Sequence, residues 1–244
     1  MGRGYSTSAI VLGSVKLGEA DRIVTLLTSE RGRVPTVVKG IRKIKSRFGG
    51  RLEPFSHLDV RLHEGRSLHT LTDADTIKTY ASVRDSADCL KASLSLVDLL
   101  NRATPELEKR PRTFNLVKKF LEAMDNASSG ATASATLLSL AAQLKFILLA
   151  GYLPRLSSCA VCGREGDHTR FSAAAGGVLC PQCDGTSFKV RPETLATTRR
   201  LLAKPLDDAL PLSADSKTER EIWQIIHETC RYHLGVDLKV EPWI

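Results

Sequence analysis

The sequence predicts an α+β protein, in which a five-stranded OB-fold barrel is followed by an α-helical domain carrying an inserted four-cysteine zinc ribbon. Three observations support this. Five short β-rich segments crowd into the first 80 residues, helical periodicity takes over afterwards, and two Cys-x-x-Cys pairs lie between later helices. We therefore expect an OB-fold domain at 1–80 and a helical domain at 81–244, with the ribbon at 159–186.

The first domain is expected to be a small barrel. Its segments are rich in β-branched residues or alternate between apolar and polar, and Gly-containing turns separate them. The five expected strands are 9–15, 22–27, 34–38, 58–62 and 68–71. The OB-fold has five such strands and commonly binds oligonucleotides. A small SH3-like barrel would fit the same pattern.

The remainder of the chain is expected to be mainly helical. Leu90, Leu94, Val97 and Leu100 recur at helical spacing and predict one buried face. Gly235 stands where a C-terminal cap belongs. The expected helices are 87–102, 113–125, 136–151, 192–202 and 217–234. No apolar run reaches membrane-spanning length, and no signal peptide is recognisable. We expect a soluble cytoplasmic protein, nucleoid-associated if it binds DNA.

A single stretch, 31–51, carries the whole net charge of the chain. It has eight basic residues and no acidic one, while the chain as a whole has 35 basic and 27 acidic residues, so 27 of each remain elsewhere. Such a concentrated positive patch attracts a polyanion, most plausibly nucleic acid. Because apolar residues are interleaved with the charges, a folded binding face is favoured over a solvated loop. The basic residues are Arg31, Arg33, Lys39, Arg42, Lys43, Lys45, Arg47 and Arg51.

Four cysteines have the spacing of a metal site. Cys159 and Cys162 form one pair, Cys180 and Cys183 form another, and 17 residues separate the pairs. This is zinc-ribbon spacing, and four thiolates fill a tetrahedral shell, so we predict one structural Zn²⁺ without an open position for catalysis. His168 lies between the pairs and is either a substitute ligand or an exposed hairpin residue.

Other reactive residues give no catalytic pattern, so we do not expect an enzyme. Cys89 and Cys230 fall on helical faces and are expected to be packed thiols. The sequence has no phosphate-cradling glycine loop, no HExxH and no nucleophilic triad. Two aspartate pairs, at 73 and 75 and at 207 and 208, are interpreted as turn residues.

Several short segments, taken in order, resemble the RecO family of bacterial recombination and repair proteins. The resemblance spans nearly the whole chain. It rests on 18–27 (GEADRIVTLL), Lys39-Gly40, 45–50 (KSRFGG), 52–55 (LEPF), 151–154 (GYLP) leading into Cys159-x-x-Cys162-Gly163, and 233–235 (HLG). It implies an N-terminal OB-fold, a helical domain with a zinc module, and a recombination mediator. Such a mediator binds single- and double-stranded DNA, anneals complementary strands, and acts with RecR and single-stranded DNA-binding protein to help load RecA.

The basic stretch suits that role, because its side chains would neutralise phosphates without reading sequence. Phe48 either stacks on a base or packs in the core. Arg199 and Arg200 either extend the DNA path or form an exposed helical pair. Two other classes stay open: an RNA-binding translation or ribosome factor, and a zinc-ribbon scaffold whose basic face docks protein.

Overall fold

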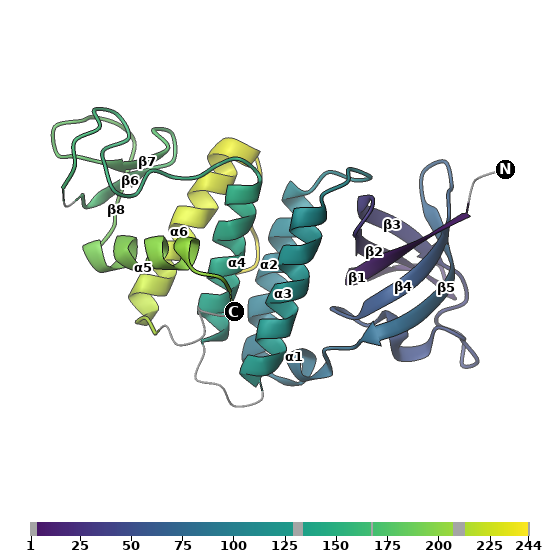
Figure 1. Cartoon of the computed structure of the whole chain (residues 1–244). Coiled ribbons are helices and arrows are strands. Elements are labelled where there is room, and N and C mark those ends of the chain that lie inside the picture. The colour runs from purple at the N-terminus through teal and green to yellow at the C-terminus, as the bar shows by residue number, and fades with distance from the viewer. Residues whose placement is uncertain (1–3, 129–133, 167, 207–212, 244) are drawn as a thin grey trace. The chain divides into compact units, whose positions relative to one another are not determined.

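The computed structural model describes residues 4–128, 134–166, 168–206 and 213–243, which form two compact units (Figure 1). One unit joins Met1–Asp85 to Thr104–Asp125, and the other joins Ser86–Ala103 to Asn126–Ile244. Each unit therefore contains two separate stretches of chain. The expected domain boundary after residue 80 stays a prediction, because compactness does not establish which stretch folds independently.

A closed five-stranded barrel forms most of the first unit. Its strand order is β1-β2-β3-β5-β4, and β1 pairs with β4 to close it. Because β3 pairs with β5, and in parallel, the barrel is OB-like and not a simple meander. The strands are β1 (Gly4–Leu17), β2 (Asp21–Thr28), β3 (Gly32–Val38), β4 (His57–His63) and β5 (His69–Lys78).

The interior of the barrel is filled by alternate residues of each strand. In β3, for example, Val34 and Val38 are buried, and in β4 Leu58, Val60 and Leu62 are buried. This period of two is the signal that predicted the fourth strand, 58–62, whereas β-rich composition and turn signals predicted the others. The short η1 helix (Gly49–Leu52) follows β3 and contributes Leu52 to the same core.

Strand β5 is longer than expected and contains an aspartate pair that we had interpreted as turn residues. Asp73 and Asp75 lie opposite Arg61 and Asp59 of β4. After His69, only Leu71 and Ala74 of the strand are buried, so its second half is mostly exposed and accepts polar side chains. The turn interpretation was wrong because this strand lacks apolar alternation. The second pair, 207 and 208, lies outside the described residues.

The connector 104–110 and α3 (Pro111–Ser128), as far as Asp125, complete the first unit. Backbone N–H of Leu107 donates to the carbonyl of Arg33 at 2.9 Å, and the Arg33 side chain donates to the carbonyl of Thr104 at 3.0 Å. Gly32 has a φ of 63°, and a Cβ there would lie 2.0 Å from the carbonyl oxygen of Glu108. Only glycine lets the two backbones approach this closely.

The second unit is built from helices around α4 (Ala135–Leu149). α4 is apolar on nearly all sides, and its Ser139 and Gln143 are nevertheless fully buried. Ser139 donates to the carbonyl of Ala92 at 2.6 Å, and Gln143 donates to the hydroxyl of Ser95 at 3.1 Å. These buried hydrogen bonds fix the position of α4 against α2. The other helices are α1 (Ala81–Asp85) of the first unit, α2 (Ala87–Ala103), α5 (Pro192–Ala203) and α6 (Ser216–Thr229).

The buried face of α2 differs from the expected one. Val97 and Leu100 are buried as predicted, whereas Leu94 is 38% exposed. Ser93 and Ser95 are buried instead, and the hydroxyl of Ser95 donates to the carbonyl of Val240 at 2.7 Å. Apolar periodicity pointed to the wrong flank because the buried residues of this helix include two serines, which an apolar pattern does not count.

The last expected helix is two elements. α6 ends at Thr229, and the five residues of η3 (Cys230–Leu234) continue it as a π-helical turn. Gly235 then caps the segment with a left-handed φ of 66°, as predicted. Within the described ranges, no helix combines the length and the apolar character needed to cross a membrane.

The close approach at Gly32 generates a stability prediction. Gly32→Ala should lower the free energy of unfolding by about 2 kcal/mol, because alanine pays for a left-handed φ and its Cβ collides with the connector backbone. Urea denaturation would measure this. Gly13→Ala is the matched control, since its φ is not left-handed and no atom lies within 4 Å of a Cβ there. Equal losses in both variants would contradict the prediction.

Two buried histidines predict a pH dependence of barrel stability. Burial lowers the pKa of His57, helped by Lys118, and burial lowers the pKa of His69, helped by Arg31. The folded state therefore keeps both imidazoles neutral while the unfolded chain takes up protons near pH 6.5. The contribution of the two neutral histidines to the free energy of unfolding should be fully present above this pH. It should be lost as the pH decreases below it.

Urea midpoints at neutral and mildly acidic pH would test this dependence. A His57→Gln, His69→Gln variant should lose much of the difference between the two midpoints. His63→Gln, on an exposed side chain of the same strand as His57, should retain it. An unchanged pH dependence in the double variant would show that other groups are responsible.

Candidate functional site

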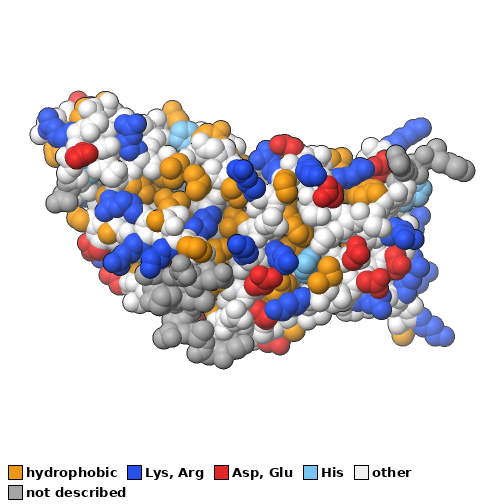
Figure 2. All heavy atoms as spheres, viewed as in Figure 1, with side chains coloured by type: hydrophobic (Ala, Val, Ile, Leu, Met, Phe, Trp, Pro, Cys, Tyr) orange, Lys and Arg blue, Asp and Glu red, His pale blue; other side chains and the backbone are white. Residues whose placement is uncertain are grey.

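A basic loop, residues 39–51, connects β3 to η1 and extends along that helix. It is the part of the basic stretch that is open to solvent. Figure 2 shows Lys and Arg side chains gathered at the right-hand end of the view, where Figure 1 places the barrel. Its exposed basic residues are Lys39, Arg42, Lys43, Lys45, Arg47 and Arg51.

Apolar side chains anchor this loop to the barrel. Phe48 is 3% exposed and belongs to the barrel core, and Ile41 packs against that core. The backbone is tied down as well: the N–H of Gly40 donates to the carboxylate of Asp21 at 2.7 Å, and the N–H of Arg42 donates to the carbonyl of Ala20 at 3.0 Å. The basic side chains therefore project from a fixed segment and not from a free coil.

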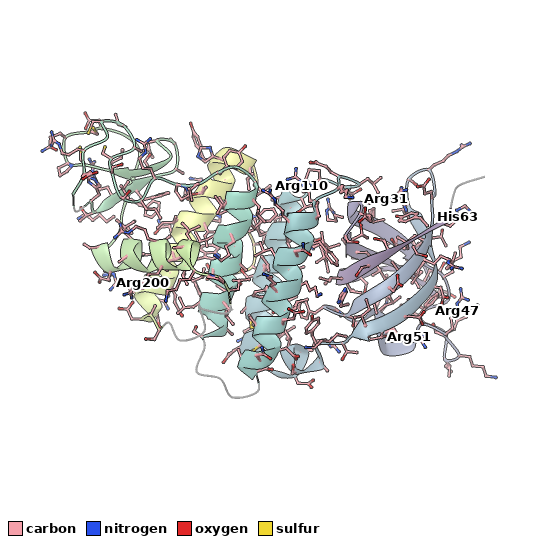
Figure 3. The ribbon with its side chains drawn as sticks, in the orientation of Figure 1. Arg31, Arg47, Arg51, His63, Arg110 and Arg200 are labelled. Atoms are coloured by element: carbon pink, nitrogen blue, oxygen red, sulfur yellow. The ribbon has the colours of Figure 1, made fainter. Side chains whose placement is uncertain are left out.

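Backbone carbonyls orient the arginines of the loop. Arg42 donates to the carbonyl of Gly18 at 3.2 Å and Arg47 to that of Thr72 at 2.7 Å. Arg51 donates to the carbonyl of Ala74 at 3.1 Å. A carbonyl fixes a guanidinium without cancelling its charge, so each arginine stays available to an anion. Arg47 and Arg51 lie at the lower end of the barrel in Figure 3.

The lysines of the loop border a groove. Within the part of the chain that the structure describes, Lys39, Lys43 and Lys45 have no acidic partner. Together with Arg47, Thr70 and Thr72 they line a groove of about 470 Å³ between the loop and β5. A groove with uncompensated positive charge concentrates the field along its length.

Two of the expected binding arginines are paired with carboxylates in the structure, and their role on DNA stays a prediction. Arg31 forms an ion pair with Glu64 and lies 4.0 Å over the ring of Tyr5. Arg33 is bound by Glu106 at 3.2 Å and by the connector carbonyl, and its side chain is only 20% exposed. The sequence stretch counts eight charges, but carboxylates distant in sequence neutralise these two.

Phe48 cannot stack on a base from its observed position. Its ring fills the barrel core, so the core alternative holds, and the guanidinium of Arg47 covers it at 4.8 Å from the ring centroid. Arg199 and Arg200 are exposed on α5 of the second unit, as an exposed helical pair would be. Arg199 also donates to the carbonyl of Leu156 at 2.8 Å. A role of this pair on DNA stays a prediction.

The four cysteines converge in the second unit, as predicted. Their sulfur atoms all lie within 4.8 Å of one another, and the sulfurs of Cys162 and Cys180 are 3.7 Å apart. A tetrahedral thiolate site with metal–sulfur bonds of about 2.3 Å has sulfur–sulfur edges of about 3.8 Å. The cluster could therefore hold a metal ion. The hairpin β6 (Arg170–Ser172) and β7 (Gly177–Leu179), with β8 (Phe188–Lys189), positions it.

Backbone hydrogen bonds stabilise the thiolate form of the first cysteine. The N–H groups of Cys162 and Cys180 donate to the sulfur of Cys159 and lower the pKa of its thiol to about 5. Hydrogen bonding to the sulfur of Cys180, and then of Cys162, raises the pKa of Cys183 to about 12. Crowded sulfurs resist carrying several negative charges, and a divalent cation would relieve that repulsion.

Residues around the cluster hold its two turns. Gly163 takes a φ of 75° and closes the first turn through a bond from its N–H to the carbonyl of Cys159 at 2.9 Å. Arg170 donates to the carbonyls of Cys180 and Cys183, at 2.5 Å and 2.7 Å, and so fixes the second turn.

The remaining thiols and His168 lie apart from the cluster. Cys89 and Cys230 are buried single thiols, as expected. His168 is buried and neither a ligand nor exposed, because its Nε2 lies 2.9 Å from the carbonyl of Arg164. The sequence interpretation missed the burial of His168 and the supporting role of Arg170, since both depend on side-chain contacts to backbone carbonyls that residue spacing does not reveal.

Two family models match the chain. The model of the N-terminal part of recombination protein O covers residues 1–80, and that of its C-terminal part covers residues 88–242. The chain belongs to the RecO family.

Individual relatives agree with this assignment. The DNA repair protein RecO of Nocardioides sp. strain JS614 is 39% identical over 98% of both chains. That of Rubrobacter xylanophilus is 40% identical over 84% of this chain and 83% of its own length. The RecO protein of Thermobifida fusca is 39% identical over 89% of this chain and 87% of its own. These alignments span both units, so the RecO likeness covers the barrel and the cysteine-bearing part together.

The cysteine cluster generates a test of metal binding. Purified protein should contain about one metal ion per chain, and Cys159→Ser, Cys162→Ser should lose it and unfold at lower temperature, because metal binding adds to folding free energy. Elemental analysis and thermal melting would measure both effects. Cys89→Ser removes a buried thiol outside the cluster and should keep the metal. Metal-free wild-type protein, prepared reduced, would contradict the assignment.

Proposed function

We propose that this RecO-family protein is a recombination mediator that binds single- and double-stranded DNA without sequence specificity and anneals complementary strands. The observation that carries the proposal is the anchored basic loop. Six exposed cationic side chains on one fixed segment, beside a groove, provide phosphate contacts at several points of one strand.

The chemistry of the loop suits contacts to the backbone of DNA. Lysine ammonium groups and carbonyl-fixed guanidinium groups bind phosphate oxygens, which are the same in every sequence. Binding by the backbone leaves the base edges free to pair. Positive charge between two strands also lowers their mutual repulsion, so strands held on such a surface can meet and anneal.

The metal proposed for the four cysteines is Zn²⁺ with a structural role. Four thiolates at a tetrahedral spacing are a donor set that zinc prefers, and they fill its coordination shell. When bound, the ion would join the two turns at 159–163 and 180–183, and so stabilise the hairpin between them. We propose that the protein works by binding and not by catalysis.

The partners proposed for this protein come from its family. They are RecR, single-stranded DNA-binding protein and, indirectly, RecA, in the bacterial cytoplasm at the nucleoid. The names of the relatives, DNA repair protein RecO, support a role in repair. The OB-like barrel supports contact with nucleic acid. OB-folds also bind RNA, so the experiment below compares DNA with structured RNA.

The loop lysines generate a quantitative prediction. With about six phosphate contacts, log affinity for single strands should fall with log salt with a slope of roughly −4. The triple variant Lys39→Gln, Lys43→Gln, Lys45→Gln should weaken binding and reduce the size of that slope by about 2. It makes three fewer phosphate contacts, so its binding releases fewer counterions. Fluorescence anisotropy over a salt series, with single-stranded DNA, duplex DNA and structured RNA, would measure this.

A control variant separates local from global charge. Lys119→Gln, Lys189→Gln, Lys217→Gln removes the same net charge from exposed lysines outside the loop. It should leave the slope close to that of the wild type. Equal losses in the two variants would show that the basic loop is not the DNA site, and tighter binding of structured RNA than of single-stranded DNA would favour an RNA-binding factor.

A further inference from the structure

Ile44 is an unusual residue at the apex of the basic loop. Its side chain is fully exposed, while its neighbours in the loop, Ile41 and Phe48, pack on or in the barrel core. A single exposed apolar residue needs no explanation by itself. The position of Ile44 needs an explanation, because this aliphatic residue lies in the sequence between Lys43 and Lys45, two lysines that line the groove.

The backbone holds Ile44 at the tip of a turn. The N–H of Ser46 donates to the carbonyl of Lys43 at 2.9 Å, which makes Ile44 and Lys45 the two central residues. A preceding turn is closed by the N–H of Lys43 and the carbonyl of Gly40 at 3.1 Å. Central turn positions favour proline, glycine and short polar residues, and isoleucine prefers strands. Local propensity therefore does not explain this residue.

The surroundings of Ile44 indicate what could cover it. Lys43 and Lys45 have no acidic partner among the described residues, so a partner presenting anions on both sides of an apolar surface would match all three side chains. A nucleic-acid strand has this arrangement, since successive phosphates flank a stack of flat bases. Aliphatic side chains are known to enter between neighbouring bases and open the stack.

We propose that Ile44 is a wedge that inserts between two neighbouring bases of a bound single strand while Lys43 and Lys45 hold the phosphates on either side. This inference rests on the proposed function, because it requires that the loop binds DNA. Insertion costs least in a single strand, whose bases are not paired. An opened stack would keep the strand extended and its bases accessible to a complementary strand.

Stacking can be followed with a short oligodeoxyadenylate containing several 2-aminopurines, whose fluorescence rises when they unstack. Saturating wild-type protein should raise the fluorescence. Ile44→Ser should bind about fivefold more weakly, because an apolar contact is lost. The salt dependence of its binding should be unchanged. At saturation it should cause little rise in fluorescence. Ile44→Phe should keep the rise, because a larger apolar side chain also separates bases.

Ile77→Ser is the matched control. Ile77 is 55% exposed on β5 of the same barrel, but its neighbour Lys78 is bound by Asp125 at 2.7 Å. This variant should behave like the wild type. Normal binding by Ile44→Ser with a full rise in fluorescence would overturn the wedge and leave the proposed function standing. Failure of the wild type to bind DNA would overturn the proposed function, and the wedge with it.

Discussion

The candidate site depends on the packing of the basic loop's apolar residues into the barrel. Charged side chains repel one another, and a segment carrying six of them without acidic neighbours would not keep a fixed shape unaided. Phe48 and Leu52 bury themselves in the barrel core, and Ile41 packs against it. The hydrophobic effect thus holds the basic loop in one conformation, although its charged side chains repel one another. The positive groove therefore depends on the packing of the barrel core.

A second contact, made by Asp21, holds the start of the basic loop. Asp21 belongs to the segment 18–27, which resembles the RecO family. Asp21 stands in a run of strand residues, where an aspartate is unfavourable. Its carboxylate accepts the N–H of Gly40, which fixes the start of the basic loop to the first hairpin. In the cysteine cluster, Arg170 has a comparable role, because it joins the carbonyls of two of the four cysteines. In each case one charged side chain holds backbone groups of the candidate site in place.

The sequence predicted well what depends on local pattern, and less well what depends on distant contacts. Strand alternation, cysteine spacing and the clustering of charge are local, and the barrel, the sulfur cluster and the exposed loop followed from them. The neutralisation of Arg31 by Glu64 and of Arg33 by Glu106 requires pairing across the fold. Leu94 and His168 were misplaced for the same reason, since the burial of serines on a helix face and of an imidazole in a loop is not encoded in apolar periodicity.

The division of the chain into interleaved units has a consequence for synthesis on the ribosome. The N-terminal unit needs the stretch Thr104–Asp125, which emerges only after α2 of the other unit. The barrel strands can pair early, but the surface that receives the connector at Gly32 stays uncovered until then. Both units therefore become complete late, and their folding is linked in time by the order in which the chain leaves the exit tunnel.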